Sequence, residues 1–214
     1  MTIDDEVRDG LLEILSAEER ERARKFAAEE DRRRFIAARG GLRRILGRYT
    51  GADPAALSFV YGEFGKPELD PSFTKNGLRF NLSHAGDIAL CAVTEGCEVG
   101  IDIEVVRSKL DVDQIAERFF SPEERRIVAE APDKADTFVR IWVRKEAYLK
   151  GIGRGIGTDL TVVTVSPEGE VAPVEGPDQG EDEWIVREVP VPAGYRAAVA
   201  TPGVLRLSMR RYIE

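Results

Sequence analysis

Two acidic residues have a spacing that could place a metal ion between them. Asp102 and Glu104 lie two residues apart in an apolar segment that is typical of a β-strand, so their side chains point to the same face. Two carboxylates on one face repel each other unless a cation or a proton lies between them. The alternative is a strand that ends at the surface with both acids solvated, and the spacing alone leaves that alternative open.

A third acid lies in a segment with helical spacing. Glu146 falls beside an apolar stripe, and Lys150 follows one turn later on the same side. The two residues could form a surface ion pair only. Alternatively, Glu146 is a third ligand of a hard cation and Lys150 holds a phosphate, because a carboxylate beside an apolar stripe needs a partner. Three carboxylates without a histidine favour magnesium over zinc. The stripe consists of Phe138, Trp142, Leu149 and Ile152.

The single histidine, His84, directly follows Ser83. Neighbouring side chains of an extended chain point to opposite faces, so these two residues are a poor proton-sharing dyad. A lone histidine is usually structural, but His84 stands between a strand-like segment and a turn, where ligand contacts often lie. The sequence therefore leaves a phosphate-binding histidine open beside a structural one.

Composition and charge argue against several classes of protein. Cys91 and Cys97 lie in apolar segments that favour buried thiols, so we expect neither a disulfide framework nor a structural zinc site. No apolar run approaches the roughly 20 residues that span a bilayer, and the acidic N-terminus lacks the features of a signal peptide. We therefore expect a cytoplasmic protein. The net charge of −8 gives no overall attraction to nucleic acid.

Seven arginines and no acid occupy the segment from Arg32 to Arg48. Such a run is either a solvated helix face or a patch that meets phosphates or an acidic protein partner. The arginines stand at positions 32, 33, 34, 39, 43, 44 and 48.

The elements that would position these residues alternate between helices and strands. Capping boxes at 16–19 and 121–124 predict helix starts, as does Asp133. This order predicts an α+β chain of two similar lobes, 1–100 and 101–214, of which the second carries most of the metal and catalytic residues. We expect helices at 17–28, 30–47 and 110–120, then from 121 and from 133 to 150. We expect strands at 57–61, 78–82, 88–93, 98–104, 160–165, 184–189, 195–200 and 204–212, and a loop with a hairpin-like excursion at 166–183.

Five motifs together resemble the 4′-phosphopantetheinyl transferases, and their order and spacing match the single-chain Sfp-type branch. The resemblance runs from about residue 20 to 165. It implies a pseudo-twofold arrangement of two similar α/β lobes, with a site for coenzyme A and a metal in the cleft between them. The motifs are Gly65–Pro67 (GKP), Phe80–His84 (FNLSH), Val99–Glu104 (VGIDIE), Phe119–Glu124 (FFSPEE) and Trp142–Lys150 (WVRKEAYLK).

The resemblance also implies roles for individual residues. Asp102, Glu104 and Glu146 would coordinate magnesium together with the pyrophosphate of coenzyme A. Lys150 would contact the phosphates, with Lys145 as its basic neighbour. The other implied coenzyme A contacts are Ser83 and His84 at the nucleotide end, with His84 on the 3′-phosphate, and Lys66, Arg34 and Lys25.

The implied reaction is the attack of a carrier-protein serine on the β-phosphate of coenzyme A, with release of 3′,5′-ADP. Glu146 is the candidate general base, directly or through a metal-bound water, and Lys150 would stabilise or protonate the leaving phosphate. The partner would be an apo acyl or peptidyl carrier protein of fatty acid, polyketide or nonribosomal peptide synthesis. We expect a monomer that contacts neither a membrane nor nucleic acid.

Three other functions stay open on the sequence. A magnesium-dependent hydrolase of coenzyme A-like pyrophosphates would release 3′,5′-ADP without a carrier protein. A non-catalytic module that docks on carrier proteins would tolerate loss of the acids, and their retention speaks against it. A nucleic-acid binder that uses the arginine segment is disfavoured by the net charge and by the few aromatic residues in that segment.

Overall fold

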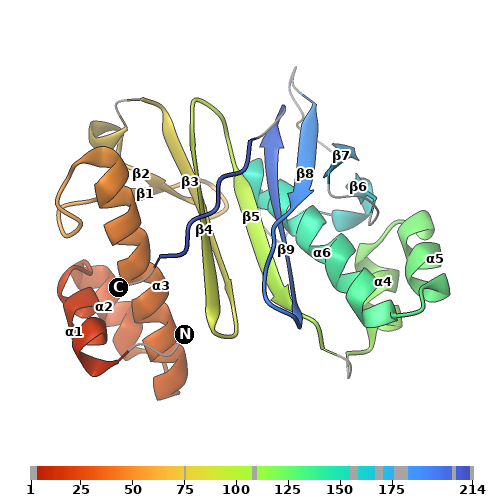
Figure 1. Ribbon diagram of the computed structural model, residues 1–214, viewed down its shortest axis with the longest axis horizontal. Helices are drawn as coiled ribbons and strands as arrows, with labels where there is room; N and C mark the ends of the chain where they lie inside the picture. The colour runs from red at the N-terminus through yellow and green to blue at the C-terminus, as the bar shows by residue number, and fades with distance from the viewer. Residues whose placement is uncertain are drawn as a thin grey trace.

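The computed structural model describes residues 4–74, 76–107, 110–154, 159–166, 171–175, 183–203 and 206–212. Its helices and strands form two lobes that lie side by side (Figure 1). The predicted α+β class is therefore confirmed. The lobe boundary at residue 100 and a pseudo-twofold relation between the lobes stay predictions. In the described part of the chain, no helix has both the length and the apolar character needed to cross a bilayer.

The N-terminal lobe packs helices against two small antiparallel sheets. Leu42 and Leu46 on its longest helix contact a cluster that includes Leu78 and Phe80 on the strands. Strand β1 pairs with β2, and β3 pairs with β4. The elements are α1 (Asp5–Glu13), α2 (Ala17–Arg24), α3 (Glu29–Thr50), β1 (Phe59–Tyr61), β2 (Pro67–Leu69), the 3-10 helix η1 (Pro71–Phe73), β3 (Leu78–Ala85) and β4 (Ile88–Glu95).

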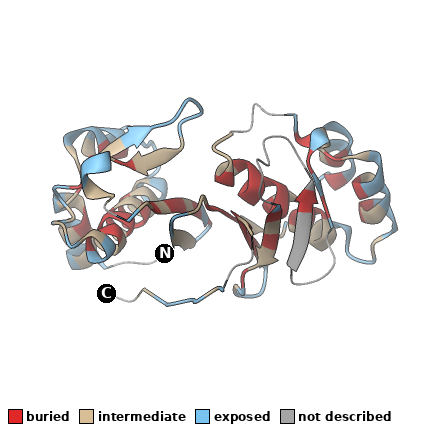
Figure 2. Cartoon of the chain, turned by 90° about the horizontal axis from the view of Figure 1, so that it is seen from above, coloured by how far each residue is buried: buried red, intermediate tan, exposed pale blue. Residues whose placement is uncertain are grey.

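The C-terminal lobe is a five-stranded antiparallel sheet in the order β5-β9-β8-β7-β6, with α6 against it. Buried residues follow α6 along much of its length and continue into the strands between the lobes (Figure 2). The elements are β5 (Gly100–Val105), α4 (Val112–Phe119), α5 (Pro122–Glu130), α6 (Lys134–Gly151), the 3-10 helix η2 (Leu160–Val162), β6 (Thr164–Val165), β7 (Val171–Glu175), β8 (Trp184–Glu188) and β9 (Tyr195–Pro202).

Strands β3 and β5 form the seam between the lobes. The buried side chain of Asn81 accepts a hydrogen bond from the backbone N–H of Ile101 at 2.9 Å. An apolar cluster across the seam contains Ala85 from β3 and Ile103 from β5. Strands β3 and β5 belong to different sheets, and the buried Asn81 side chain joins them through this hydrogen bond.

Helix α6 lies directly on β5. A methyl group at Gly100 would stand 1.9 Å from the carbonyl oxygen of Ala147 and 2.3 Å from the N–H nitrogen of Gly151. Only a glycine allows this approach of helix to strand. Because β5 carries Asp102 and α6 carries Glu146, Gly100 brings the two acids close to each other.

Most predicted helix starts are confirmed. Ser16 and Ser121 each form a complete capping box, and the Asp133 side chain caps α6. Helix α2 ends at Arg24 rather than at 28. Helix α1 was not expected, although Asp4 caps it. In each confirmed case the signal lies within one helical turn, so the sequence contains it locally.

Two predicted strands are wrong, one of them only in part. The segment 160–165 begins as a 3-10 turn, because the Asp159 side chain accepts from the N–H of Thr161, and only Thr164–Val165 pairs. The 166–183 loop contains β7. The described part of the predicted 204–212 strand, residues 206–212, forms no strand. Both sides of β9 are already occupied by β5 and β8, so this segment has no edge to join there.

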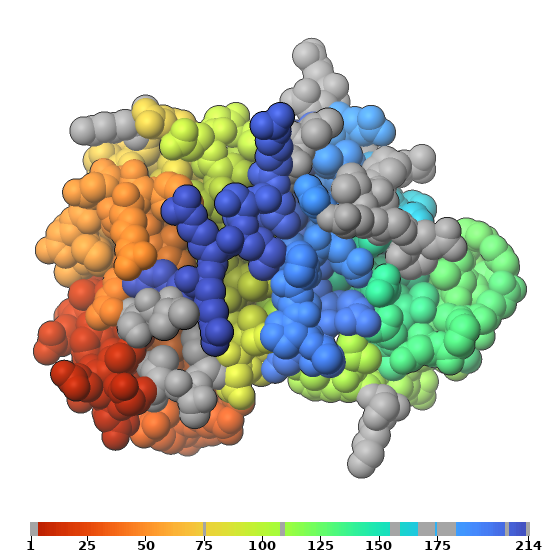
Figure 3. Space-filling view, in the orientation of Figure 1, coloured from red at the N-terminus to blue at the C-terminus, as the bar shows by residue number. Residues whose placement is uncertain are grey.

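The C-terminal segment instead returns to the N-terminal lobe. It passes in front of the strands at the seam and reaches α3 (Figures 1 and 3). Leu207 packs against the apolar cluster at the seam, and the guanidinium group of Arg48 on α3 lies 4.8 Å from the centre of the Tyr212 ring. The segment therefore contacts both lobes.

Candidate functional site

Strand β5 and helix α6 bring the three predicted acids to one place. Asp102 is 3% exposed and Glu146 is 6% exposed, while Glu104 is half-buried. Burial raises the pKa of each carboxyl group, and it raises the pKa of Glu146 to about 7. Repulsion from Asp102 adds to the rise at Glu104 and at Glu146. The acids thus face one another without enough positive charge to neutralise them.

Lys150 supplies one positive charge to this group. Its ammonium nitrogen lies 2.5 Å from Oδ1 of Asp102 and 3.0 Å from Oγ of Ser83. The Ser83 hydroxyl also donates to Oδ1 of Asp102, at 2.9 Å. Since Ser83 belongs to β3 and the other two residues to the C-terminal lobe, this contact joins the lobes at the acids.

Two carboxylate oxygens at the acids have no partner. Oδ2 of Asp102 and Oε1 of Glu146 are buried and make no hydrogen bond. Unpaired buried oxygens of this kind are expected where a cation belongs. As the side chains stand, however, no three His, Cys, Asp or Glu residues within the described ranges come close enough together to hold a metal ion. The carboxylate oxygens suit a hard cation. In this structure the ammonium group of Lys150 partly balances the negative charge of Asp102.

Basic residues from the N-terminal helices surround the end of β3. His84 is exposed there, and its pKa is lowered by partial burial and then by the charges of Lys150, Arg22 and Arg34. Arg34 on α3 also forms an ion pair with Asp87, at 3.3 Å. The group contains an imidazole and three cations, of which Arg34 and Lys150 already form ion pairs with acids that an anionic ligand would have to replace.

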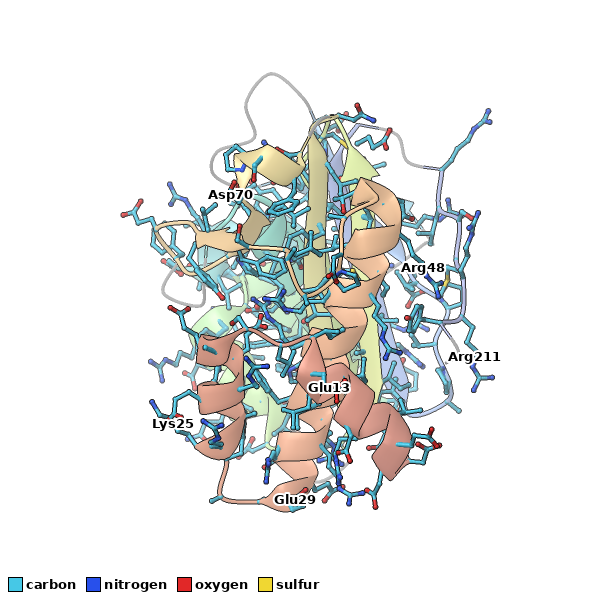
Figure 4. All side chains as sticks on the ribbon, turned by 90° about the vertical axis from the view of Figure 1, so that its left-hand side faces the viewer. Glu13, Lys25, Glu29, Arg48, Asp70 and Arg211 are labelled. Atoms are coloured by element: carbon cyan, nitrogen blue, oxygen red, sulfur yellow. The ribbon has the colours of Figure 1, made fainter. Side chains whose placement is uncertain are left out.

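Two further predicted contacts lie at different places. Lys25 is exposed at the end of α2, and its side chain points outward (Figure 4). The ammonium group of Lys66 donates to Glu98 and to the carbonyl oxygen of Gly151, each at 2.8 Å, and the side chain is only 9% exposed. Lys66 thus ties the loop before β2 to the end of α6.

The structure does not bring Lys145 to the acids. Its ammonium group is fully buried, forms an ion pair with Glu124 and lies 5.1 Å from the centre of the Phe120 ring. The Glu124 carboxylate also accepts from the backbone N–H of Ser121 and of Val165. Successive helical residues point about 100° apart, so Glu146 can face Asp102 while Lys145 faces α5. In this structure Lys145 therefore joins α6 to α5 through Glu124.

Two residues at the site were missed by the sequence reasoning. Arg22 lies near enough to His84 to lower its pKa, and Asn81 binds β5. A sequence signal existed for Asn81, because it stands two residues before Ser83 and shares its face of the strand. No such signal marks Arg22, which is one of several arginines in an exposed helix.

Two family models match most of the chain. The model described as 4′-phosphopantetheinyl transferase superfamily matches residues 98–200. The model described as 4′-phosphopantetheinyl transferase, N-terminal, matches residues 5–96. The two matches meet just before β5, at the seam between the lobes.

Curated proteins show the same similarity. The chain is 47% identical over 148 residues to the 4′-phosphopantetheinyl transferase HetI of Nostoc sp., a match that covers 68% of this chain and 62% of that protein. It is 35% identical to a 4′-phosphopantetheinyl transferase of Bacillus subtilis, over 89% of this chain and 84% of that protein. It is 30% identical to the transferase Sfp of Bacillus subtilis strain 168, over 91% and 85%.

Proposed function

Because this chain belongs to the 4′-phosphopantetheinyl transferase superfamily, we propose that it moves the phosphopantetheine arm of coenzyme A onto a serine of an apo carrier protein. The observation that carries this proposal is the group formed by Asp102, Glu104, Glu146 and Lys150. Three acids and a cation, partly buried between two lobes, are suited to a pyrophosphate and its counter-ion.

Magnesium is the metal that this donor set would hold. Asp102, Glu104 and Glu146 offer only oxygen ligands, and a buried oxygen without a partner is present on both Asp102 and Glu146. When bound, magnesium would offset the negative charge that develops on the pyrophosphate. Lys150 would then exchange Asp102 for a phosphate oxygen, which leaves Asp102 to the metal.

Glu146 and Lys150 have different tasks in the proposed reaction: Glu146 accepts a proton, and Lys150 neutralises charge. The serine oxygen of the carrier attacks the β-phosphorus, and the bond from that phosphorus to the bridging oxygen breaks. Glu146 is the candidate base for the serine proton, directly or through a metal-bound water. Burial raises its pKa to about 7 in the metal-free protein, and a bound magnesium would lower that pKa. The 3′,5′-ADP leaves with the bridging oxygen, and Lys150 neutralises its new charge.

The basic group at the end of β3 suits the nucleotide end of coenzyme A. We assign the 3′-phosphate to His84, because the imidazole is exposed at the end of β3 and the positive charges of Lys150, Arg22 and Arg34 lie near enough to lower its pKa. Lys25, at the end of the helix that carries Arg22, is a further candidate for this end. Ser83 would link the two ends of the ligand site, since it already contacts Lys150.

The second substrate is an apo acyl or peptidyl carrier protein. We further propose that the chain acts as a cytoplasmic monomer, since its substrates are a soluble cofactor and a soluble domain. The carrier could serve fatty acid, polyketide or nonribosomal peptide synthesis, because the site described above recognises coenzyme A rather than the carrier.

Mass spectrometry of several apo carriers, incubated with the protein, coenzyme A and magnesium, tests this function. We expect each accepted carrier to gain one phosphopantetheine, and the relative rates to rank the partners. Coenzyme A incubated without a carrier is the control. Release of 3′,5′-ADP in that control, with no gain of mass on any carrier, would mean that the protein is a hydrolase instead.

A further inference from the structure

His84 lies next to the tip of a tight hairpin. Strands β3 and β4 pair through Ala85 and Ile88, which leaves Gly86 and Asp87 as a two-residue turn. Gly86 has a φ of 52°, in the left-handed region that such turns require. The position of the imidazole therefore depends on where this tip is held.

In the described part of the chain, the side-chain hydrogen bonds between β3 and β5 end at Ser83, before the tip. Asn81 and Ser83 bind β5 through the backbone of Ile101 and the side chain of Asp102. Gly86 lies three positions after Ser83, a length of about 10 Å in a strand. Ala85 and Ile88, which flank the turn, pack into the apolar cluster at the seam, but this packing does not include Gly86 and Asp87 themselves.

A phenol from the other lobe supports the turn itself. A methyl group at Gly86 would stand 2.6 Å from the hydroxyl oxygen of Tyr195 and 3.5 Å from two of its ring carbons, so the ring rests on the turn. On the other side, Arg34 of α3 forms its ion pair with Asp87. The turn is thus held between α3 and the first residue of β9.

Tyr195 is itself well fixed. It pairs with Val105 at the end of β5, and the neighbouring Gly194 carbonyl accepts from the N–H of Val106 at 2.8 Å. Its ring packs against the apolar cluster at the seam. The same strand, β5, therefore carries the two acids near its middle and anchors the phenol at its end.

We propose that Tyr195 is a positioning residue for His84: it holds the Gly86–Asp87 turn against the C-terminal lobe and so sets the distance from the imidazole to Lys150. This inference rests on the proposed function in one respect, namely the assignment of the 3′-phosphate to His84. Among the described residues, no hydrogen bond or ion pair joins the Tyr195 side chain to the acids or to Lys150, so we expect its effect at the nucleotide end.

The test compares Tyr195→Leu with a control in the same apolar cluster. Leucine keeps apolar packing but loses the ring edge and the hydroxyl that rest on Gly86. Val189→Ala removes apolar contact from that cluster, where Val189 is 5% exposed, without touching the turn. Both variants lose packing, so an effect seen only in the first reports on the turn.

Kinetics with two co-substrates give the first readout. In Tyr195→Leu we expect KM for coenzyme A to rise about tenfold, the equivalent of one charge-assisted hydrogen bond, with kcat little changed. KM for dephospho-coenzyme A, which lacks the 3′-phosphate, should stay within about twofold of wild type. Equal rises for both co-substrates, or the same rises in Val189→Ala, would overturn the proposal.

The NMR signal of the imidazole gives a second readout that does not depend on activity. The chain has one histidine, so its imidazole signal is assigned without ambiguity. We expect that signal to shift and broaden in Tyr195→Leu and to stay unchanged in Val189→Ala. An unchanged signal in Tyr195→Leu would refute the positioning role. If wild type uses both co-substrates equally, the 3′-phosphate assignment fails instead, and the NMR result still decides the role of Tyr195.

Discussion

At Glu146, burial and repulsion act in the same direction. Both raise its pKa, to about 7, so the side chain is protonated in mildly acidic solution and charged in mildly basic solution. The preceding residue, Lys145, has different surroundings, because its buried ammonium group forms an ion pair with Glu124 inside the lobe. The sequence predicts both side chains at the ligand site. In the structure they leave α6 in different directions, Glu146 toward Asp102 and Lys145 toward Glu124.

The first prediction concerns the stability of Glu146→Gln without metal. The folded-state pKa of Glu146 lies above its unfolded value of 4.5, so its contribution to stability is full below that value and is lost as pH rises through 7. Chemical denaturation should therefore show that the unfolding free energy of the variant, relative to that of wild type, rises by on the order of 2 kcal/mol between pH 5 and pH 8. Added magnesium should stabilise wild type more than the variant at pH 8. A difference that does not depend on pH would contradict the burial of this carboxyl group.

The second prediction separates the two lysines of α6. Lys145→Met leaves the carboxylate of Glu124 buried without its partner, which should cost about 3–5 kcal/mol of unfolding free energy. The double variant Glu124→Gln with Lys145→Met should recover much of that loss, because no buried charge is left. Lys150→Met should instead abolish transfer while the protein stays folded. If Lys145→Met were as stable as wild type and raised only KM for coenzyme A, Lys145 would be a ligand contact after all.

Among the elements, helix α6 and strand β5 decide the site, and the sequence predicts both of them well. Local signals suffice for such elements, as in the capping box at Ser121 and the cap at Asp133. The two misassigned strands have different causes. At 160–165 the Asp159 side chain starts a 3-10 turn, and at 206–212 the chain finds no free edge of β9 to join. The three acids were predictable because their motifs lie in predictable elements. The roles of Lys145 and Arg22 depend on how helices face their neighbours, which one sequence does not determine.

The third prediction tests the contact between these two elements. Gly100→Ala would place a methyl group 1.9 Å from the Ala147 carbonyl oxygen, so α6 must move away from β5 and take Glu146 with it. A displacement near 1 Å can cost about 100-fold in rate, and we expect a single-turnover transfer rate lower by about that factor. Gly41→Ala is the control, because a methyl group there meets no atom within 4 Å. That variant should be up to about 1 kcal/mol more stable, with unchanged transfer. A normal rate in Gly100→Ala would show that α6 tolerates the displacement.

On the scale of the whole molecule, the site is divided between the lobes. Asp102, Glu146 and Lys150 belong to the C-terminal lobe, while His84 and Arg22 belong to the N-terminal lobe. Ser83 and Asn81 connect the halves at β3 and β5, and the C-terminal segment contacts both lobes on another side. A ligand that contacts both lobes should therefore stabilise both against local opening, and a ligand that lacks the group bound by one lobe should stabilise only the other.

The fourth prediction follows from this division and is measured by amide hydrogen exchange. Coenzyme A with magnesium should slow exchange in two places, at the end of α6 around Lys150 and at the β3–β4 tip around His84, because ligand binding to the folded state raises the free energy of local opening. Dephospho-coenzyme A should slow exchange at α6 and leave the tip close to its rate without ligand. His84→Ala should make the two ligands give the same pattern. Protection of the tip by both ligands in wild type would mean that the nucleotide reaches this lobe through a group other than the 3′-phosphate, and His84 would lose its assigned role while the acids kept theirs.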